Sequence, residues 1–267
     1  MFAVRKVLII APLRVARDTW SAEIEKWEHL KPLRYSVAVG TEEERLAALK
    51  APADLYIINR ENVDWLVSNT KFDYDMIVID ELSSFKNHQS KRFKALMKVR
   101  PSVKRIVGLI GTPASNGLMD LFAEFRLLDM GQRLGKFIGQ YRNAYFKPDK
   151  QNGYIVYSYK PLPDAEERIY EKISDITVSM KALDHLHMPE LLSNEYPVQL
   201  SDTEQETYKR FKSELILEMQ DTEITAANAA SLSNKLSQLA NGAVYDDTGA
   251  VIPIHSRKLD ALEDLIE

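Results

Sequence analysis

The sequence predicts an α/β fold in which helices cover both faces of a parallel β-sheet. Five short runs of residues are mainly apolar, and each is followed by a segment with the spacing of an amphipathic helix. Strands that are apolar throughout have both faces buried, and their alternation with helices is typical of a parallel sheet. After about residue 130 this alternation stops and helical patterns prevail, so a mainly helical lobe is expected to follow the sheet.

The composition excludes several classes of protein. The 267 residues carry a net charge of −4, which argues against a protein that coats nucleic acid by bulk charge. The absence of cysteine excludes disulfides and thiolate metal sites. No apolar run approaches the ~20 residues of a transmembrane helix, and the amino terminus lacks the cleavage site of a secretory signal. We therefore expect a cytoplasmic protein with no membrane partner.

The elements of the sheet domain follow from the apolar pattern. The predicted strands are residues 7–10, 35–39, 55–58, 76–79 and 106–110. The helices between and after them are marked by apolar residues at short helical spacings: Trp20, Ile24 and Trp27; Leu46 and Leu49; Trp65 and Leu66; Phe93, Leu96 and Met97; Leu118, Leu121, Phe122, Phe125 and Leu128. Thr41 and Glu44 have the spacing of a capping box, which favours a helix start there.

The second half of the chain is predicted to be mainly helical. Helices are expected near residues 137–145, 164–174, 201–219 and 225–239, and a further helix begins near residue 256. We expect three regions, with the sheet in residues 1–130, the helical lobe in 131–244 and a connection toward another domain in 245–267. The lobe also contains aromatic residues near basic ones, which either pack in its core or stack on unpaired bases: Tyr141, Tyr145, Phe146, Tyr157 and Tyr159.

The clearest chemical signal is a pair of acids, Asp80 and Glu81, directly after the apolar strand at residues 76–79. Ligands of open α/β sheets bind beyond the carboxyl ends of the strands, so this strand brings two carboxylates to the expected site. One carboxylate can hold Mg²⁺ through water, and its neighbour can orient or deprotonate an attacking water. The alternative is a solvated strand end whose acids cap the next turn.

Three other stretches bear on function. Pro12 and Arg14 follow the first strand, where backbone amides and a guanidinium suit a phosphate. The strand at residues 106–110 is followed by Gly111, Thr112 and Pro113, which are predicted to form a tight turn at the same edge of the sheet. This turn either belongs to the site or only connects two elements. Between residues 86 and 105 there are eight Lys or Arg and no acid. This basic run either lies near a phosphate track, with Lys91, Arg92 and Lys94 as contacts, or is a solvated face.

The order of these motifs resembles the first RecA-like domain of superfamily-two helicases, specifically the Swi/Snf-type double-stranded DNA translocases. The family's motifs Ia, II and III correspond here to IIAPLRV, VIDELSSFKN and GLIGTPASN. Lys86 and Asn87 match the residues that follow the family's acid pair, and INREN at residues 58–62 falls where the family has a further DNA-contacting turn. The compact versions encoded by phages and prophages are the most similar, which implies a bacterial or phage-infected cell.

The resemblance implies a RecA-like sheet followed by an insertion lobe, and a role for each matched residue. Asp80 would hold Mg²⁺ through water, and Glu81 would activate the water that attacks the γ-phosphate of ATP. Gly111, Thr112 and Pro113 would couple the nucleotide state to the grip on DNA. Pro12, Arg14 and Arg60 would contact the DNA backbone without reading sequence, so ATP, Mg²⁺ and DNA are the implied cofactors and partner.

Two departures from the family pattern limit what the chain can do alone. The sequence has no G-x-x-x-x-G-K-[ST] motif, and Gly131 to Lys136 is a near match that has one residue too few between its glycines. It also has no second RecA-like domain. We expect a central piece of a translocase, from just after the P-loop to the start of the second domain, that is inactive as an ATPase by itself. Leu82-Ser83 replaces the family's Ala-His, which puts coupling through that histidine in doubt.

Two other readings remain. The chain is either this translocase fragment or a non-catalytic nucleic-acid-binding or interaction module on the same fold; a two-metal nuclease is disfavoured because it needs more acids. In the resembled fold, the strand at residues 106–110 lies beside the absent P-loop strand. We expect its free edge to be covered by the amino-terminal residues, the helical lobe or a second copy, because a bare edge is an aggregation template.

Overall fold

The computed structural model describes residues 4–111, 117–180, 192–214, 216–219, 222–225, 229–246 and 248–266. The chain divides into two compact units, Met1–Met180 and Lys181–Glu267, which are described separately. No helix in these described ranges is long and apolar enough to cross a membrane.

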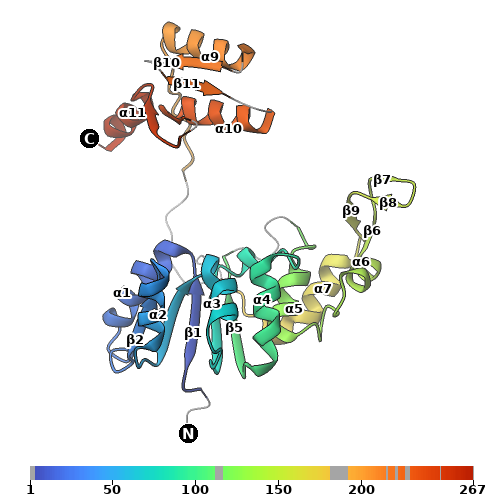
Figure 1. Ribbon diagram of the computed structural model, residues 1–267. Helices are drawn as coiled ribbons and strands as arrows, with labels where there is room; N and C mark the ends of the chain where they lie inside the picture. Colours follow the sequence, from blue (N-terminus) through green and yellow to red (C-terminus); the bar gives the residue numbers. More distant parts are fainter. Residues whose placement is uncertain are drawn as a thin grey trace. The chain divides into compact units, whose positions relative to one another are not determined.

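The first unit is built on a five-stranded sheet with the order β2-β3-β1-β4-β5, and every pair in it is parallel (Figure 1). Its strands are β1 (Val7–Ala11), β2 (Tyr35–Ala38), β3 (Leu55–Asn59), β4 (Met76–Asp80) and β5 (Arg105–Leu109). The interior strands β1 and β3 are buried along almost their whole length. The predicted parallel α/β sheet is therefore confirmed, with each strand within one residue of its expected position.

Helices cover both faces of this sheet. They are α1 (Trp20–Lys26), which continues a π-helical turn η1 (Val15–Thr19), and α2 (Glu42–Lys50), α3 (Val63–Asn69), α4 (Lys91–Val99) and α5 (Leu121–Asp129). Leu8 and Ile10 of β1 share one core with residues of α3, α4 and α5, whereas Ile9 packs on the other face with residues of η1 and α1. This division follows from the two-residue side-chain period of a strand. Trp27 was expected to be buried but is 49% exposed, because the helix ends before it.

Strand β5 lies at an edge of the sheet and pairs with β4 alone among the described strands. The amino-terminal residues Arg5 and Lys6 instead donate backbone N–H groups to the carboxylate of Asp75, just before β4. The described amino-terminal residues therefore do not cover the free edge of β5, contrary to one of the three expectations. Cover by the helical lobe or by a second copy of the chain stays a prediction.

The rest of the first unit packs around a second core. Helices α6 (Ile138–Tyr145) and α7 (Ala165–Ile173) flank an antiparallel hairpin made of β6 (Phe146–Pro148), β7 (Gln151–Asn152), β8 (Ile155–Val156) and β9 (Tyr159–Pro161). Phe122 and Phe125 of α5 share this core with Tyr141 and Ile169. The boundary expected at residue 130 consequently falls inside a compact unit that extends to Met180.

The second unit is smaller and has its own core, formed by Phe211, Leu236, Leu239 and Val244. Its described helices are α9 (Asp202–Glu214), α10 (Ala229–Ala240) and α11 (Arg257–Ile266). Two antiparallel pairs of strands accompany them: β10 (Ile216–Met219) pairs with β11 (Thr222–Thr225), and β12 (Ala243–Tyr245) pairs with β13 (Val251–Pro253). Ser201 and Glu204 form a capping pair at the start of α9, since each donates its backbone N–H to the side chain of the other. Helix α9 is shorter than expected because the chain turns into β10.

Candidate functional site at the carboxyl edge of the sheet

The parallel strands bring most of the predicted site residues to one edge of the sheet. Arg60 follows β3, Pro12 and Arg14 follow β1, Asp80 ends β4 and Gly111 lies two residues after β5. Because β3, β1, β4 and β5 are consecutive neighbours, these residues lie in that order along the carboxyl edge. Thr112 and Pro113, together with Asn116, fall outside the described residues.

Asp80 is held by a residue from a distant helix. The indole Nε1 of Trp20 donates a hydrogen bond to Asp80 Oδ2 at 3.0 Å, across a sequence separation of 60 residues. The Asp80 side chain is half-buried, so the indole fixes one carboxylate oxygen in a partly desolvated position. The sequence marked Trp20 only as a core residue. Its contact with Asp80 depends on how η1 and α1 return over the sheet, which no local pattern contains.

Glu81 has a strained backbone. Its φ and ψ are 60° and 65°, in the left-handed region that glycine favours and glutamate rarely adopts. Such strain costs of order 1–3 kcal/mol and is concentrated at functional sites. Ser83, which stands where the resembled motif has histidine, donates its hydroxyl to Glu81 Oε1. The turn therefore places an exposed carboxylate beside Asp80 and restrains its direction.

A third acid, Glu124 of α5, lies near this pair and was not anticipated. Only 2% of Glu124 is exposed. Burial, together with the negative charges of Asp120 and Glu81 and against the opposing charge of Lys86, raises its pKa to about 7. Lys86 Nζ lies 3.6 Å from Asp120 Oδ2. The sequence signal was available: a single acid stands between Phe122 and Phe125 on the predicted apolar helix.

This raised pKa predicts that Glu124 destabilises the fold at alkaline pH. The carboxyl titrates near 4.5 when unfolded and near 7 when folded, so the folded state binds more protons between these values. Stability should therefore fall as pH rises from 4.5 to 7, by about 3 kcal/mol for this group. Glu124→Gln should match the unchanged protein in urea unfolding at pH 4.5 and exceed it in stability at pH 8. Glu167→Gln, which changes an exposed residue on α7, should have the same stability as the unchanged protein at both pH values. Equal urea unfolding curves for all three proteins would contradict the raised pKa of Glu124.

The acid pair suits one kind of metal ion. Among the described residues no group of three or more His, Asp or Glu is arranged to hold a metal, so a protein-made cage is not formed there. Mg²⁺ commonly binds one or two carboxylates while keeping several waters and using substrate phosphates. The oxygen donors of Asp80 and Glu81 fit that ion.

The near match to a P-loop at Gly131 to Lys136 is a helix end. The Asp129 carboxylate accepts the backbone N–H groups of Gly131, Gln132 and Arg133 at 2.8, 3.1 and 3.0 Å. Amides that a phosphate would need are therefore already paired with an internal anion. A side chain at Gly131 would also meet the carbonyl of Gly135 at 2.6 Å, so the glycine serves a tight turn. The structure of this segment is therefore consistent with the sequence mismatch that separates it from a P-loop.

The basic run after Asp80 divides into paired and exposed members. Lys86 faces Asp120, Lys104 Nζ lies 2.6 Å from Asp75, and Arg100 is only 8% exposed. Each of these three cations has a partner within the fold, whereas the proposed contact of the run with a phosphate track stays a prediction. Lys91 and Lys94 on α4 are exposed and Arg92 is half-buried. At the sheet edge Arg14 is exposed, whereas Arg60 is engaged with Glu61 at 2.9 Å.

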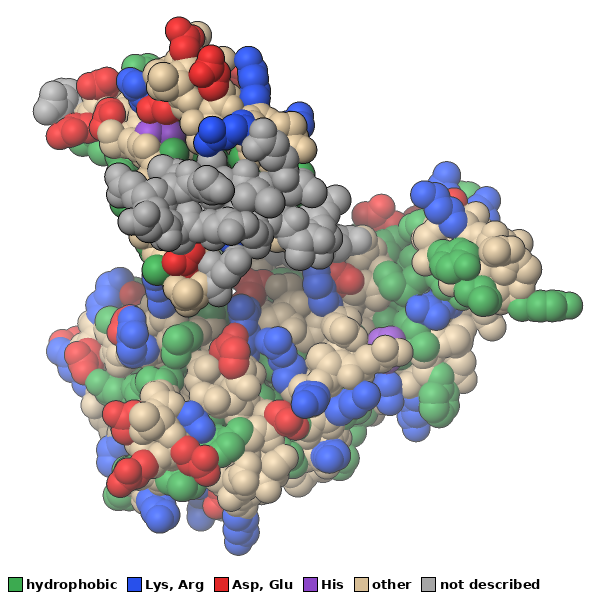
Figure 2. Space-filling view, turned by 45° about the horizontal axis from the view of Figure 1, so that its top comes forward, with side chains coloured by type: hydrophobic (Ala, Val, Ile, Leu, Met, Phe, Trp, Pro, Cys, Tyr) green, Lys and Arg blue, Asp and Glu red, His purple; other side chains and the backbone are tan. Residues whose placement is uncertain are grey.

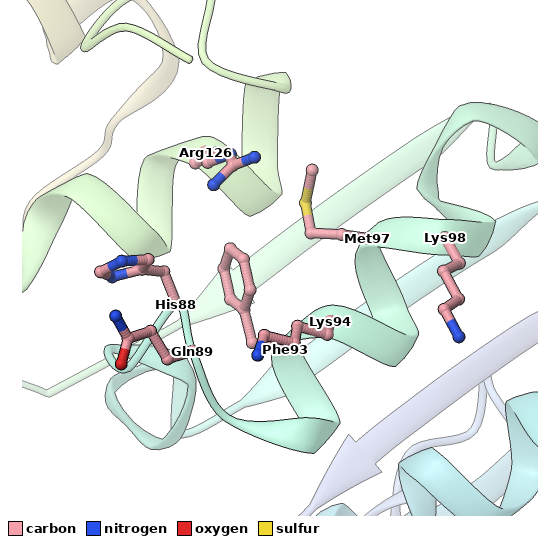
Figure 3. A pocket seen from close by; sticks show the side chains of 7 residues that line it. All are labelled: His88, Gln89, Phe93, Lys94, Met97, Lys98 and Arg126. Atoms are coloured by element: carbon pink, nitrogen blue, oxygen red, sulfur yellow. The ribbon is translucent and has the colours of Figure 1, made fainter. Parts of the chain in front are cut away.

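A cavity of about 510 Å³ opens between α4 and α5. Its lining combines cations, amide and imidazole groups and an apolar floor: His88, Gln89, Phe93, Lys94, Met97, Lys98 and Arg126 (Figure 3). Phe93 and Met97 project from α4 toward Arg126 in this view. Burial lowers the pKa of His88, and Arg126, Arg142 and Lys94 lower it further. The positive charges of Lys94, Lys98 and Arg126 make this surface suited to anionic groups.

Comparison with known proteins identifies relatives of the chain. Residues 2–244 match the SNF2-related domain. The chain is 35% identical to the putative protein p41 of Acyrthosiphon pisum secondary endosymbiont phage 1, over 98% of this chain and 59% of that protein. It is 30% identical to the chromatin remodeling factor mit1 of Schizosaccharomyces pombe, over 46% of this chain and 9% of that protein. The chain thus spans about three-fifths of the phage protein and a small part of mit1.

The fold has a solved counterpart as well. It superimposes on the Sulfolobus solfataricus SWI2/SNF2 ATPase core in complex with dsDNA, with a TM-score of 0.54 and 22% identity, covering 80% of this chain and 42% of that one. The RecA-like α/β fold and the Swi/Snf-type resemblance inferred from the motifs are confirmed, including the similarity to a phage protein. The chain belongs to the SNF2-related domain family.

Proposed function

We propose that this chain is the first RecA-like domain and insertion of an ATP-dependent DNA translocase. The observation that carries the proposal is the placement of Asp80 and Glu81 at the end of β4, between Pro12 and Arg14 after β1 and Gly111 after β5. Ligands of such sheets bind at this edge. Membership of the SNF2-related family and the fold of a core solved with dsDNA support this function.

The roles of the residues follow from their positions. Mg-ATP, when bound, supplies the phosphoryl group and the cation that neutralises its charge. Asp80, oriented by the Trp20 indole, would hold that cation through water. Glu81, exposed beside it, accepts the proton of the attacking water at its carboxylate. The left-handed backbone of Glu81 is a conformation that the surrounding structure must impose, as is common at functional sites.

This chain holds only part of the machinery. The sequence contains no P-loop, and the glycine turn that most resembles one has its amides paired with Asp129. Among the described residues, this turn therefore offers no phosphate cradle. We propose that the chain alone has no measurable ATPase activity. A non-catalytic binding module on the same fold is the second candidate, and this same lack of a cradle favours it.

The DNA contact is testable with the chain as it stands. Changing Lys91, Arg92 and Lys94 together to Glu should weaken duplex binding at least about tenfold and reduce the slope of log K against log salt by about 0.9 for each lost phosphate contact. Fluorescence anisotropy over a salt series measures both quantities. Changing Arg5, Lys50 and Lys71 to Glu alters the net charge equally at the amino edge of the sheet and should have little effect. If the two triple variants lose equal duplex affinity, the exposed cations of α4 form a solvated face and not a DNA contact.

A further inference from the structure

The hairpin β6 to β9 exposes aromatic and apolar residues at its tip. Tyr154 in the turn is fully exposed, and Tyr157 and Ile155 are 68% and 62% exposed. In Figure 1 the hairpin projects beyond α6, with β7 and β8 at its far end. Figure 2 shows hydrophobic side chains at the end of this projection and Lys or Arg side chains beside them. Large apolar groups exposed together mark an interaction site more often than chance.

The base of the hairpin is firmly held. Phe146 is 7% exposed and belongs to the core shared by α5, α6 and α7. Leu162 donates its backbone N–H to Tyr145 at 2.9 Å, and the Arg142 guanidinium lies 4.6 Å from the centre of the Tyr159 ring. A two-stranded hairpin is marginally stable alone, so these contacts hold it in place. The tip is thus presented on a fixed stem.

The charges on the hairpin are arranged at a cost to its stability. Lys147 of β6 and Lys160 of β9 are directly paired across the two strands. Like charges in this position destabilise a sheet. Lys150 is exposed, and the acid in this segment, Asp149, accepts a hydrogen bond from Ser158 at 2.8 Å. The repulsion is relieved when an anion lies against the paired lysines, which indicates an anionic partner.

We infer that this hairpin binds an unpaired nucleic-acid strand, with Tyr154 and Tyr157 stacking on bases and Lys147 and Lys160 contacting phosphates. The inference rests on the proposed function and adds a contact outside the sheet edge. Exposed aromatic rings beside cations are the combination that binds single strands without sequence preference. Base faces are available to such rings in an unpaired strand, whereas duplex stacking covers them. An acidic protein segment would satisfy the lysines but would give no reason for two exposed tyrosines at the tip.

The test uses the complete 267-residue chain and two fluorescein-labelled DNAs. One is a dumbbell duplex closed by loops of a non-nucleotide linker, which offers no unpaired base, and the other is the same duplex with one open end and a tail of about 12 thymidines. The change Tyr154→Ala with Tyr157→Ala should weaken binding to the tailed DNA by roughly tenfold or more, because each stacked base contributes at least about fivefold. Binding to the dumbbell should not change.

The lysines give a second, independent readout. The change Lys147→Gln with Lys160→Gln should weaken tailed-DNA binding and reduce its salt slope by about 0.7 for each lost phosphate contact, while raising the melting temperature slightly. Tyr196→Ala removes a half-exposed tyrosine from the second unit and serves as the matched control.

The outcomes separate the hairpin from the proposed function. Tyrosine variants that bind both DNAs like the unchanged chain overturn the inference. The inference is also overturned if the tyrosine variants lose equal affinity for both DNAs, because the tyrosines would then contact the duplex. If the α4 charge reversals weaken dumbbell binding while the tyrosine variants leave tailed binding intact, the hairpin inference alone fails. If the unchanged chain binds neither DNA, both the DNA contact of the proposed function and the hairpin inference fail.

Discussion

Replacing Arg100 with alanine is expected to lower the free energy of unfolding of the first unit by about 3 kcal/mol. Its guanidinium donates to the carbonyls of Leu127, Leu128 and Val103 at 2.9, 2.7 and 3.0 Å. Two of these carbonyls lie in the last turn of α5, where a helix has no internal partners for its C=O groups. The alanine variant would leave buried acceptors unpaired and open a cavity.

Urea unfolding followed by circular dichroism measures this effect. Lys98→Ala changes an exposed residue on the adjoining turn of α4 and should alter stability by less than about 0.5 kcal/mol. Arg100→Lys keeps the charge but cannot reach three carbonyls, so its loss should be intermediate. If Arg100→Ala unfolds at the same urea concentration as Lys98→Ala, the structural role of Arg100 is wrong.

Arg100 also shows where sequence reasoning reaches its limit. In the sequence it is one of eight cations in an acid-free run, and nothing local separates it from Lys94 or Lys98. Its burial depends on the end of α5, 27 residues further along the chain. The same is true of the bond between Trp20 and Asp80. Contacts between distant segments require the fold, so the acids were predicted and the groups that hold them were not.

The sheet was predictable because burial on both faces leaves a strong mark on each strand. Residues 55–58 and 76–79 are apolar throughout, and only a covered parallel sheet explains several such runs alternating with helices. The hairpin from Phe146 to Pro161 had no such mark. Its strands have two or three residues each and its exposed tip carries no alternation, so the sequence could not separate aromatics that pack in the lobe from those free to stack on bases. Tyr141, Tyr145 and Phe146 are indeed buried, whereas Tyr157 is not.

The change Glu81→Gln is expected to lower ATP turnover by roughly 10²- to 10⁴-fold, the range contributed by a positioned general base. The measurement requires a longer protein that joins a P-loop segment before this chain and a second RecA-like domain after it, and the rate is followed with and without duplex DNA. Glutamine has nearly the size of glutamate and can accept the Ser83 hydroxyl, but it cannot take a proton from water. ATP binding should therefore survive while hydrolysis is lost.

Two neighbouring changes show whether the loss belongs to the carboxylate or to the strained turn. Ser83→Ala removes the hydroxyl that restrains Glu81 and should reduce turnover far less, because the base remains. Trp20→Phe keeps the ring but removes the Nε1–H bonded to Asp80. Since Asp80 is proposed to hold Mg²⁺, this variant should need more Mg²⁺ for half-maximal activity and recover when Mg²⁺ is raised, whereas Glu81→Gln should not recover. Full activity in Glu81→Gln would remove Glu81 from the role of base. A longer protein that binds DNA but never hydrolyses ATP would favour the non-catalytic module.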